Sequence, residues 1–528
     1  PALATDVSYG RDEGRTSFFY YDEATPGAAN TTTAYLGVCE EPAFSDEGGV
    51  KTSSLELTLT APEGSTIYYT TDCSTPTTAS TPYTGPISIA ENTVIRAIAV
   101  RDGYLTSTTA TRTYITEDTH TVRVVSLVTD DKYLFSDEMG MYADGPNWQE
   151  KSPHGSPGVG ANFWMDWEYP VHVEVWEADG TRLIEQDGSF KLNGQYSRAL
   201  DQKSFAVYAR SEYGDEDRFY APLFSDREYT DYKSFVLRCT GQDYNRSRMR
   251  DAMITGTMEG QDVMYQETEV CVLYLNGEYW GVYFMKEKRN RFFVAQHENT
   301  ENNVDLAIGK GFKQRSYGDN SDWVSLYEYA TSHDLSSADA YNYVAERMDV
   351  DSFRDYMIAE IYNGNTDTYN FQYYRLKGGK WKFIFYDFCW GFQNPGHETL
   401  AFRMGKTPSD VCSAKLFAAM LQNKGWRDSF CRRFGELLNT AFAPERVSAL
   451  IEELYGYVEP EIKREREKFN KDTFMGVKQP NTNLGTYEGF QSEISKLKDF
   501  AQRRPEELKR QLQSNLGLSD SYMKEVFG

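Results

Sequence analysis

Short runs in which apolar and polar residues alternate fill the chain from residue 41 to residue 115. The runs are seven or eight residues long, and Pro, Gly, Asn and Asp stand between them: LELTLTAP, STIYYTTD, PISIAEN, TVIRAIAV and TATRTYI. Alternation with a period of two places neighbouring side chains on opposite faces of a strand. The pattern therefore predicts a small antiparallel, all-β sandwich.

Strand patterns continue in the next segment and then give way to helical spacing around residues 245–258. The strand-like runs are TVRVVSLVTD, YPVHVEVWEADG, SFKLNG and KSFAVYAR. The run VCVLYLNGEYWGVYFMKEK predicts a β-hairpin, because Asn276-Gly277 is the pair that a type I′ turn prefers. The chain is mostly helical at about 396–528, and we interpret the charged run KREREKF at 463–469 as a solvent-exposed helix face. Mixed α and β structure, of the α+β class, is predicted.

The segment from Asn363 to Phe388 reads NGNTDTYNFQYYRLKGGKWKFIFYDF and follows a predicted helix. The helix is indicated by apolar residues three and four positions apart: Val350, Phe353, Met357 and Ile361. It should end at Asn363-Gly364, because these residue types are common at helix C-termini. Two strands, FQYYRL and WKFIFY, are then joined by a turn at Gly378-Gly379, and Asp387 follows the second strand.

Composition limits the classes of protein to consider. At 528 residues and 60.4 kDa the chain is long enough for several domains, and its 15% aromatic content supplies cores for them. A net charge of −24 disfavours nucleic acid and anionic membranes, because both would be repelled. We expect no membrane insertion, since there is no apolar run of about 18 residues, and no signal sequence opens this chain. Seven cysteines without CxxC spacing argue against structural zinc or dense disulfides.

The loop before the hairpin and the hairpin itself carry the residue types that phosphoryl transfer requires. Such an enzyme uses one carboxylate to position the attacking hydroxyl, and an amide oxygen with a second carboxylate to hold Mg²⁺ against the phosphates. Asp367, Asn370 and Asp387 supply this set, in the chain order found in protein kinases. Each residue alone is more simply a turn cap or a strand end, whereas the three together favour the catalytic interpretation.

Other chemistries lack their motifs. The sequence has no HExxH pair, no GxSxG elbow and no GxxxxGK[ST] loop, so zinc hydrolase, serine hydrolase and P-loop interpretations have no support. Paired acids for glycoside hydrolysis stay open, because Asp and Glu are abundant and their separation in space cannot be read from a sequence.

The sequence resembles the CotH family of atypical protein kinases, which are associated with the spore coat and widespread as secreted bacterial proteins. The matching phrases lie between about Val124 and Trp390: VVSLVTD, KLNGQYSRALDQKSF, MRDAM, YLNGEYWGVYFMKEK, NGNTDTYN and FIFYDFCWGF. The resemblance implies a protein-kinase-like domain over residues 117–528, with ATP and Mg²⁺ (or Mn²⁺) as cofactors. It also implies transfer of the γ-phosphoryl group to Ser or Thr hydroxyls of a secreted or surface protein.

By motif, the resemblance makes Asp367 the catalytic base, Asn370 a metal ligand and Asp387 the principal Mg²⁺ ligand. The family commonly has WDxD here, whereas this chain has Cys389 at the second carboxylate position. A thiol is a poor ligand for a hard cation. The alternative function is therefore a catalytically weak or inactive kinase-like protein that binds a surface or a carbohydrate.

The resemblance also implies residues that bind the nucleotide. Lys203, in the phrase NGQYSRALDQKSF, is expected to pair with the ATP phosphates, and Arg198 of the same phrase is expected to contact them too. Met285 is expected to contact adenine, as part of the segment 285–288. Glu287 is expected either to join that contact or to form an ion pair.

The N-terminal part resembles two accessory modules of bacterial surface proteins. Residues 39–116, with the phrases PAFSDEGG, IYYTTDCSTP, YTGPISI and VIRAIAV, resemble the chitobiase/β-hexosaminidase C-terminal repeat. The resemblance implies that the sandwich is immunoglobulin-like. Residues 1–38 resemble the closing strands of a lamin-tail β-sandwich. A passive spacer and a contact with cell-surface glycan are both interpretations of the repeat. Together the modules imply a secreted or cell-surface bacterial protein.

Overall fold

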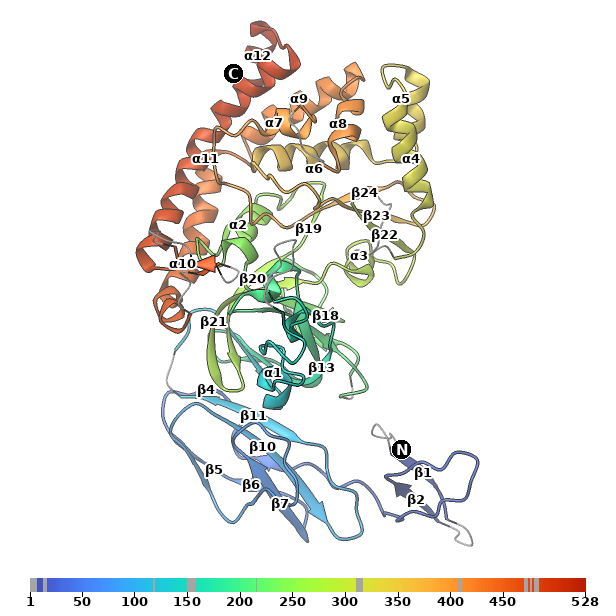
Figure 1. The fold of residues 1–528 in the computed structure, drawn as a ribbon, viewed down its shortest axis with the longest axis vertical. Helices are drawn as coiled ribbons and strands as arrows, with labels where there is room; N and C mark the ends of the chain where they lie inside the picture. Colours follow the sequence, from blue (N-terminus) through green and yellow to red (C-terminus); the bar gives the residue numbers. More distant parts are fainter. Residues whose placement is uncertain are drawn as a thin grey trace. The chain divides into compact units, whose positions relative to one another are not determined.

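Figure 1 shows the fold of the computed structural model, which divides into two compact units. The first comprises residues 1–223, 230–234 and 271–283, and the second comprises residues 224–229, 235–270 and 284–528. The structure describes residues 7–12, 17–116, 119–149, 158–214, 216–309, 317–406, 411–469, 473–474, 477–478 and 484–528. The chain is a mixed α/β protein in which the N-terminal region is rich in strands and the helices gather toward the C-terminus.

The first unit opens with a two-stranded ribbon and the predicted sandwich. The ribbon pairs β1 (Ser8–Arg11) with β2 (Phe18–Tyr21), and a five-stranded sheet has the order β4-β11-β10-β7-β8. The other sandwich strands pair as β3-β6 and β5-β9. Their bounds are β3 (Ala43–Phe44), β4 (Gly49–Val50), β5 (Leu55–Leu57), β6 (Leu59–Thr60), β7 (Ser65–Thr70), β8 (Thr81–Pro82), β9 (Ile87–Ile89), β10 (Thr93–Arg101) and β11 (Ala110–Ile115). One core joins the sheets, with Leu57, Ile67, Ile95 and Tyr114 buried together.

Seven strands form a closed barrel in the order β12-β13-β14-β15-β18-β21-β20. Their bounds are β12 (Arg123–Val128), β13 (Tyr169–Trp176), β14 (Arg182–Asn193), β15 (Ser204–Ala209), β18 (Ser234–Arg238), β20 (Thr268–Leu275) and β21 (Glu278–Glu287). The connections carry α1 (Asp131–Phe135) and the short pair β16 (Phe219–Tyr220) and β17 (Asp231–Tyr232). Strand β12 is buried along its whole length.

The hairpin between β20 and β21 has the predicted turn. Asn276 and Gly277 both have positive φ, 52° and 79°, which is what a type I′ turn demands of its two central residues. The Asn276 side chain also accepts a hydrogen bond from the backbone N–H of Thr129 at 2.8 Å. The prediction of a hairpin at Asn276-Gly277 is confirmed.

The second unit contains a four-stranded sheet with the order β19-β24-β23-β22. Its strands are β19 (Met264–Tyr265), β22 (Val304–Ile308), β23 (Gln372–Leu376) and β24 (Lys382–Phe385), and β23 pairs with β24 as an antiparallel hairpin. Helix α6 (Val350–Tyr362) precedes the hairpin and begins at Asp349, whose carboxylate accepts the N–H groups of the first turn. It ends where predicted, and Gly364 follows with a φ of 66°. The predicted helix and hairpin are both confirmed.

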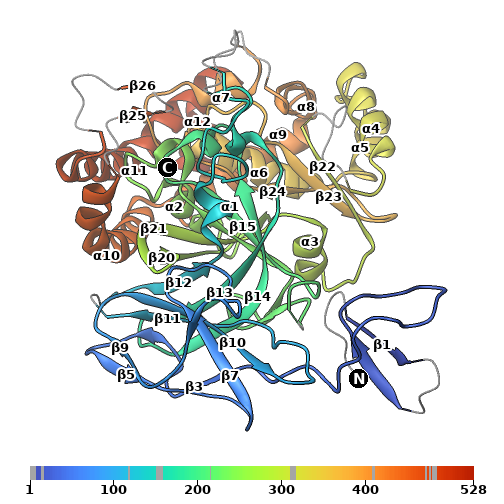
Figure 2. The ribbon, with the colours of Figure 1, turned by 60° about the horizontal axis from the view of Figure 1, so that its bottom comes forward.

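The remaining helices belong to the same unit and gather toward its C-terminal end. They are α2 (Arg250–Gly256), α3 (Arg291–His297), α4 (Ser321–Ser332), α5 (Ala338–Ala345), α7 (Thr399–Arg403), α8 (Ala414–Met420), α9 (Lys424–Leu438), α10 (Pro444–Lys468), α11 (Tyr487–Leu516) and α12 (Asp520–Phe527). A short ribbon, β25 (Thr473–Phe474) and β26 (Val477–Lys478), lies between α10 and α11 in the chain. The long helices α10 and α11 pack along each other (Figure 2). Among the described helices, none has both the length and the apolar character that crossing a membrane requires.

The charged run at 463–469 is not simply a solvent-exposed helix face, as the sequence had suggested. Glu465, on α10, is fully buried and forms an ion pair with the equally buried Arg248 at 2.8 Å. Arg248 lies just before α2 and also donates to the backbone oxygen of Cys239 at 3.1 Å. Helical periodicity turns Glu465 inward, and the buried Arg248 compensates its charge.

Replacing Glu465 by Ala should destabilise the protein by about 3–5 kcal/mol, because it leaves Arg248 buried without its carboxylate. Glu467 is two residues away on the exposed side of α10 and serves as the matched control. Glu467→Ala should change the free energy of unfolding by less than about 0.5 kcal/mol. Urea unfolding of both variants tests this, and equal stability losses would refute the buried ion pair.

A buried carboxylate lies where the sandwich strand β11 meets the barrel strands β12 and β13. Glu174 on β13 accepts the backbone N–H of Thr113 at 3.0 Å, and the Thr113 hydroxyl is 2.8 Å from that of Ser126. Burial raises the pKa of Glu174 to about 7, against the opposing effect of His172. A carboxyl with this pKa binds its proton more tightly in the folded protein than in the unfolded chain.

The contribution of Glu174 to stability should therefore be fully present below its unfolded pKa and should disappear as pH rises toward 7. Between pH 4.5 and 7.5 the protein should lose about 3 kcal/mol relative to Glu174→Gln, whose amide does not titrate. Unfolding of both proteins across this pH range measures the difference. Parallel pH profiles would contradict a raised pKa at this position.

Candidate functional site

A buried ion pair joins strand β21 to helix α2 in the second unit. Lys286 is the ninth residue of β21, and its Nζ lies 2.7 Å from Oδ2 of Asp251, the second residue of α2. Both side chains are only 3% exposed. A lysine in an otherwise apolar strand can be buried in charged form only if such a partner compensates it.

Arg238, the last residue of β18, extends this pair into a chain of alternating charges. Its Nη2 lies 2.5 Å from Oδ1 of Asp387, and its Nε lies 3.5 Å from Oδ2 of Asp251. The order of charges is therefore Lys286, Asp251, Arg238 and Asp387. Each carboxylate is next to a cation, which is the arrangement that makes the burial of four charges tolerable.

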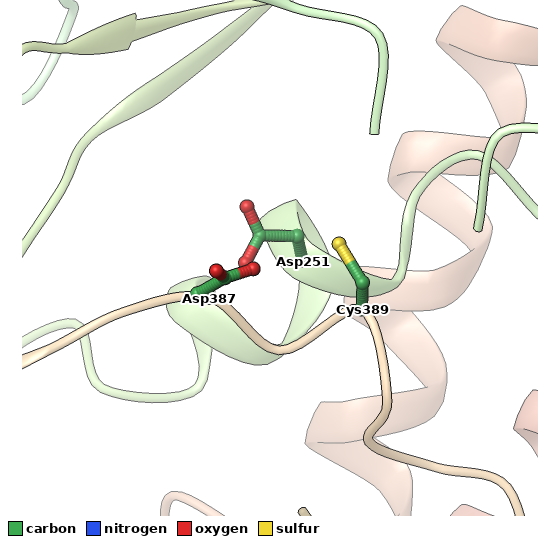
Figure 3. A group of neighbouring side chains, drawn as sticks. All are labelled: Asp251, Asp387 and Cys389. Atoms are coloured by element: carbon green, nitrogen blue, oxygen red, sulfur yellow. The ribbon is translucent and has the colours of Figure 1, made fainter. Parts of the chain in front are cut away.

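The backbone after β24 places Asp387 beside Asp251 (Figure 3). Asp387 has a φ of 64°, in the left-handed region that Asp adopts more readily than most residues. The next residue, Phe388, is fully buried and donates its N–H to Oδ1 of Asp251 at 2.7 Å. This bond fixes the turn that presents Asp387, whose side chain stays 29% exposed.

Asp251 stays ionised although it is buried. Burial alone would raise the pKa of its carboxyl, but the charges of Lys286 and Arg238, with the hydrogen bond from Phe388, outweigh that effect. The pKa of Asp251 is therefore held well below its usual range. The carboxylate serves as a fixed anion that positions two cations at ordinary pH.

Cys389 completes the group of side chains around Arg238. Ligand atoms of Asp251, Asp387 and Cys389 all lie within 4.8 Å of one another, which is close enough for a shared metal ion. The Cys389 thiol, however, donates to the backbone oxygen of Thr240 at 3.0 Å and accepts from Arg238 at 3.1 Å. Burial raises the pKa of this thiol far above its usual range. A protonated, buried thiol does not fit a site for a hard divalent cation.

Asp367 and Asn370 lie together on the loop that follows α6. The amide nitrogen of Asn370 donates to Oδ2 of Asp367 at 3.1 Å, and the N–H of Tyr369 donates to Oδ1 of Asp367, also at 3.1 Å. Since the amide nitrogen faces Asp367, the amide oxygen of Asn370 points away from that carboxylate. Both side chains are half-buried.

A buried arginine holds this loop in place. Arg403, on α7, pairs with Glu360 of α6 at 2.6 Å, and both side chains are almost completely buried. The same guanidinium donates to the backbone oxygens of Asn365 and Asp367 at 2.9 and 3.1 Å. The Arg403 guanidinium thus holds the loop through its backbone oxygens, and the buried carboxylate of Glu360 compensates its charge.

Tyr386 links the loop electrostatically to the end of β24. Burial raises the pKa of its phenol, the Arg289 guanidinium 3.5 Å from the ring centre lowers it, and the charges of Asp387 and Asp367 raise it further. Both carboxylates therefore lie within electrostatic range of one buried side chain. The structure brings Asp387 together with Asp251 and Cys389, and Asp367 together with Asn370.

The basic residues expected to bind phosphates belong to the first unit. The ammonium of Lys203 donates to the backbone oxygens of Arg198 and Leu200 at 2.6 and 3.1 Å. The guanidinium of Arg198 donates to the backbone oxygens of Gly194 and Leu192 at 3.0 and 3.2 Å. Their described bonds fix the segment that precedes β15. Phosphate binding by Lys203 and Arg198 stays a prediction.

The two residues expected near adenine are both buried on β21. Met285 is fully buried, and a contact with adenine stays a prediction. Glu287 forms an ion pair with Arg227 at 3.0 Å and accepts a bond from Tyr229, and its part in an adenine contact stays a prediction. Burial would raise the pKa of Glu287, but His297 and Arg227 outweigh it and lower the pKa to about 2.

No individual role was predicted from sequence for three residues of the charge chain: Lys286, Asp251 and Arg238. Lys286 was included only in the segment 285–288, which was expected to contact adenine. The sequence itself distinguishes two of the three residues from their neighbours. Lys286 directly follows the apolar run YWGVYFM, and Asp251 lies in MRDAM, one of the phrases that carried the resemblance. Arg238 ends an apolar strand and had no distinguishing pattern of its own.

Two models of known families match the chain. The model of the family described as CotH kinase protein matches residues 190–508, and the model of the chitobiase/beta-hexosaminidase C-terminal domain matches residues 46–112. The chain belongs to the CotH kinase family. A search of curated proteins gave no match.

The seven cysteines are all free and buried, so we predict that none reacts rapidly with a thiol reagent in the folded protein at pH 8. Addition of denaturant should expose all seven. Titration with Ellman's reagent before and after unfolding measures this. A fast-reacting thiol that is lost in Cys389→Ser would contradict the buried, protonated state of Cys389.

Proposed function

We propose that this chain is an ATP-dependent protein kinase that transfers the γ-phosphoryl group to Ser or Thr hydroxyls. The observation that carries the proposal is the buried Lys286–Asp251 pair beside Asp387. Protein kinases use a strand lysine fixed by a helix carboxylate, together with a metal-binding aspartate at the end of a later hairpin. A protein-kinase-like fold for this family member is part of the proposal.

Lys286 is the residue that we assign to the phosphates, in preference to the predicted Lys203. It belongs to the same compact unit as Asp387 and Asp367, and it is neighbour to the charge chain that ends at Asp387. Asp251 acts as its positioning residue. Its carboxylate lies 2.7 Å from the ammonium and fixes the direction of the Lys286 side chain.

Asp387 and Asn370 would hold Mg²⁺ or Mn²⁺. Their oxygens are the hard donors that such cations prefer, and the carboxylate of Asp387 is the accessible one of its group. When bound, the ion would neutralise phosphate charge during transfer. Cys389 is not part of this ligand set.

Asp367 would position the acceptor hydroxyl. Its carboxylate oxygens accept bonds from Tyr369 and Asn370, which fix its rotamer on a loop that Arg403 holds rigid. A preorganised carboxylate orients a hydroxyl and accepts its proton without reorganising during the reaction. The acceptor is proposed to be a secreted or cell-surface protein, with the sandwich as spacer or glycan contact.

Removal of Asp367, Asp387 or Lys286 should reduce phosphoryl transfer by two or more orders of magnitude, because each acts directly on a reacting group. The assay incubates the chain with radiolabelled ATP, Mn²⁺ and a generic protein acceptor. The variants are Asp367→Ala, Asp387→Ala and Lys286→Met.

Exposed residues of the same types serve as matched controls: Asp339→Ala on α5 and Lys380→Met in the β23–β24 turn. Both should retain the full rate. If the wild-type chain transfers no phosphate, or if Asp367→Ala and Asp387→Ala transfer as fast as the controls, the kinase assignment is wrong.

The second candidate is a kinase-like protein without catalysis, and the buried thiol of Cys389 favours it. Thermal unfolding with ATP distinguishes the two. Stabilisation that requires a divalent cation supports the kinase, whereas stabilisation by glycans without any nucleotide response supports the alternative.

A further inference from the structure

Arg238 has a position that the proposed reaction does not explain. Its guanidinium contacts every member of the group that could share a metal ion, at 2.5 Å from Asp387, 3.1 Å from Cys389 and 3.5 Å from Asp251. Only 19% of its side chain is exposed. A cation of the protein itself thus lies among the three ligand atoms.

The charges of this group balance without any further ion. Lys286 and Arg238 contribute two positive charges, and Asp251 and Asp387 contribute two negative charges. Cys389 contributes no charge, since its thiol donates a hydrogen bond to the Thr240 oxygen. In the absence of nucleotide, a divalent cation placed among these three ligand atoms would add two positive charges that no side chain of the group compensates.

The surrounding backbone encloses the guanidinium. Gly241 has a φ of 55°, and a Cβ there would lie 3.4 Å from the sulfur of Cys389 and 3.6 Å from Nη2 of Arg238. Arg289 adds another positive charge nearby, stacked over Tyr386. Asp387 is the most exposed member of the group, at 29% of its side chain.

We infer that Arg238 takes the place of a second metal ion, so that this chain binds one divalent cation with its nucleotide. The inference rests on the proposed function. A carboxylate at position 389 would make the group net negative and would favour a second cation. With an uncharged thiol at this position, Arg238 supplies the positive charge beside Asp387 instead. The guanidinium is a fixed charge, and it positions Asp387 through the bond at 2.5 Å.

Mn²⁺ stoichiometry tests this directly. The chain is titrated with Mn²⁺ in the presence of the non-hydrolysable ATP analogue adenylyl imidodiphosphate, and free Mn²⁺ is measured by electron paramagnetic resonance. Wild type should bind one Mn²⁺ per chain. Arg238→Lys, which keeps the positive charge, should also bind one, and Arg238→Met should bind two because it leaves Asp251 and Asp387 with one cation fewer.

Two Mn²⁺ ions bound to wild type, or one bound to a folded Arg238→Met, would overturn the inference. Circular dichroism reports whether the Met variant folds, and if it does not, the stoichiometry of wild type still decides. Two ions together with active phosphoryl transfer would refute only the role of Arg238. Failure of every variant to bind Mn²⁺ and the analogue would refute the proposed function itself.

Discussion

The chain of charges from Lys286 through Asp251 and Arg238 to Asp387 is the interaction on which the rest of the site depends. Four ionised side chains this close to the core are stable only when each has an opposite charge in contact with it. These four charged side chains also link elements that are far apart in the sequence: β18, α2, β21 and the turn after β24. Their geometry therefore fixes where Lys286 and Asp387 point.

Buried arginines fix the surrounding backbone in a similar way. Arg403 holds the loop that carries Asp367, and Arg248 ties the segment before α2 to α10. Arg504, on α11, donates to the backbone oxygens at the end of α6, including those of Ile361 and Tyr362. Because a guanidinium has five donors in a rigid plane, one side chain can satisfy several carbonyls that no secondary structure pairs. The helical part thereby supports the site loop.

Much of the local structure could be predicted from sequence, because short-range physics determines it. The Asn276-Gly277 turn and the end of α6 at Gly364 depend on backbone preferences of single residues. Which charges are buried could not be predicted, because that depends on partners distant in sequence. Glu465 lies in a run that looks solvent-exposed, and its partner Arg248 is more than two hundred residues earlier. The choice between Lys203 and Lys286 is of the same kind, since only the fold brings Lys286 to Asp251.

The most direct measurement is a crystal structure with Mn²⁺ and adenylyl imidodiphosphate, in which anomalous scattering locates the metal. The account predicts one anomalous peak, held by Asp387 and Asn370, with Lys286 at a phosphate oxygen and Arg238 still in contact with Asp387. A peak among Asp251, Asp387 and Cys389, with the Arg238 side chain displaced from them, would contradict it.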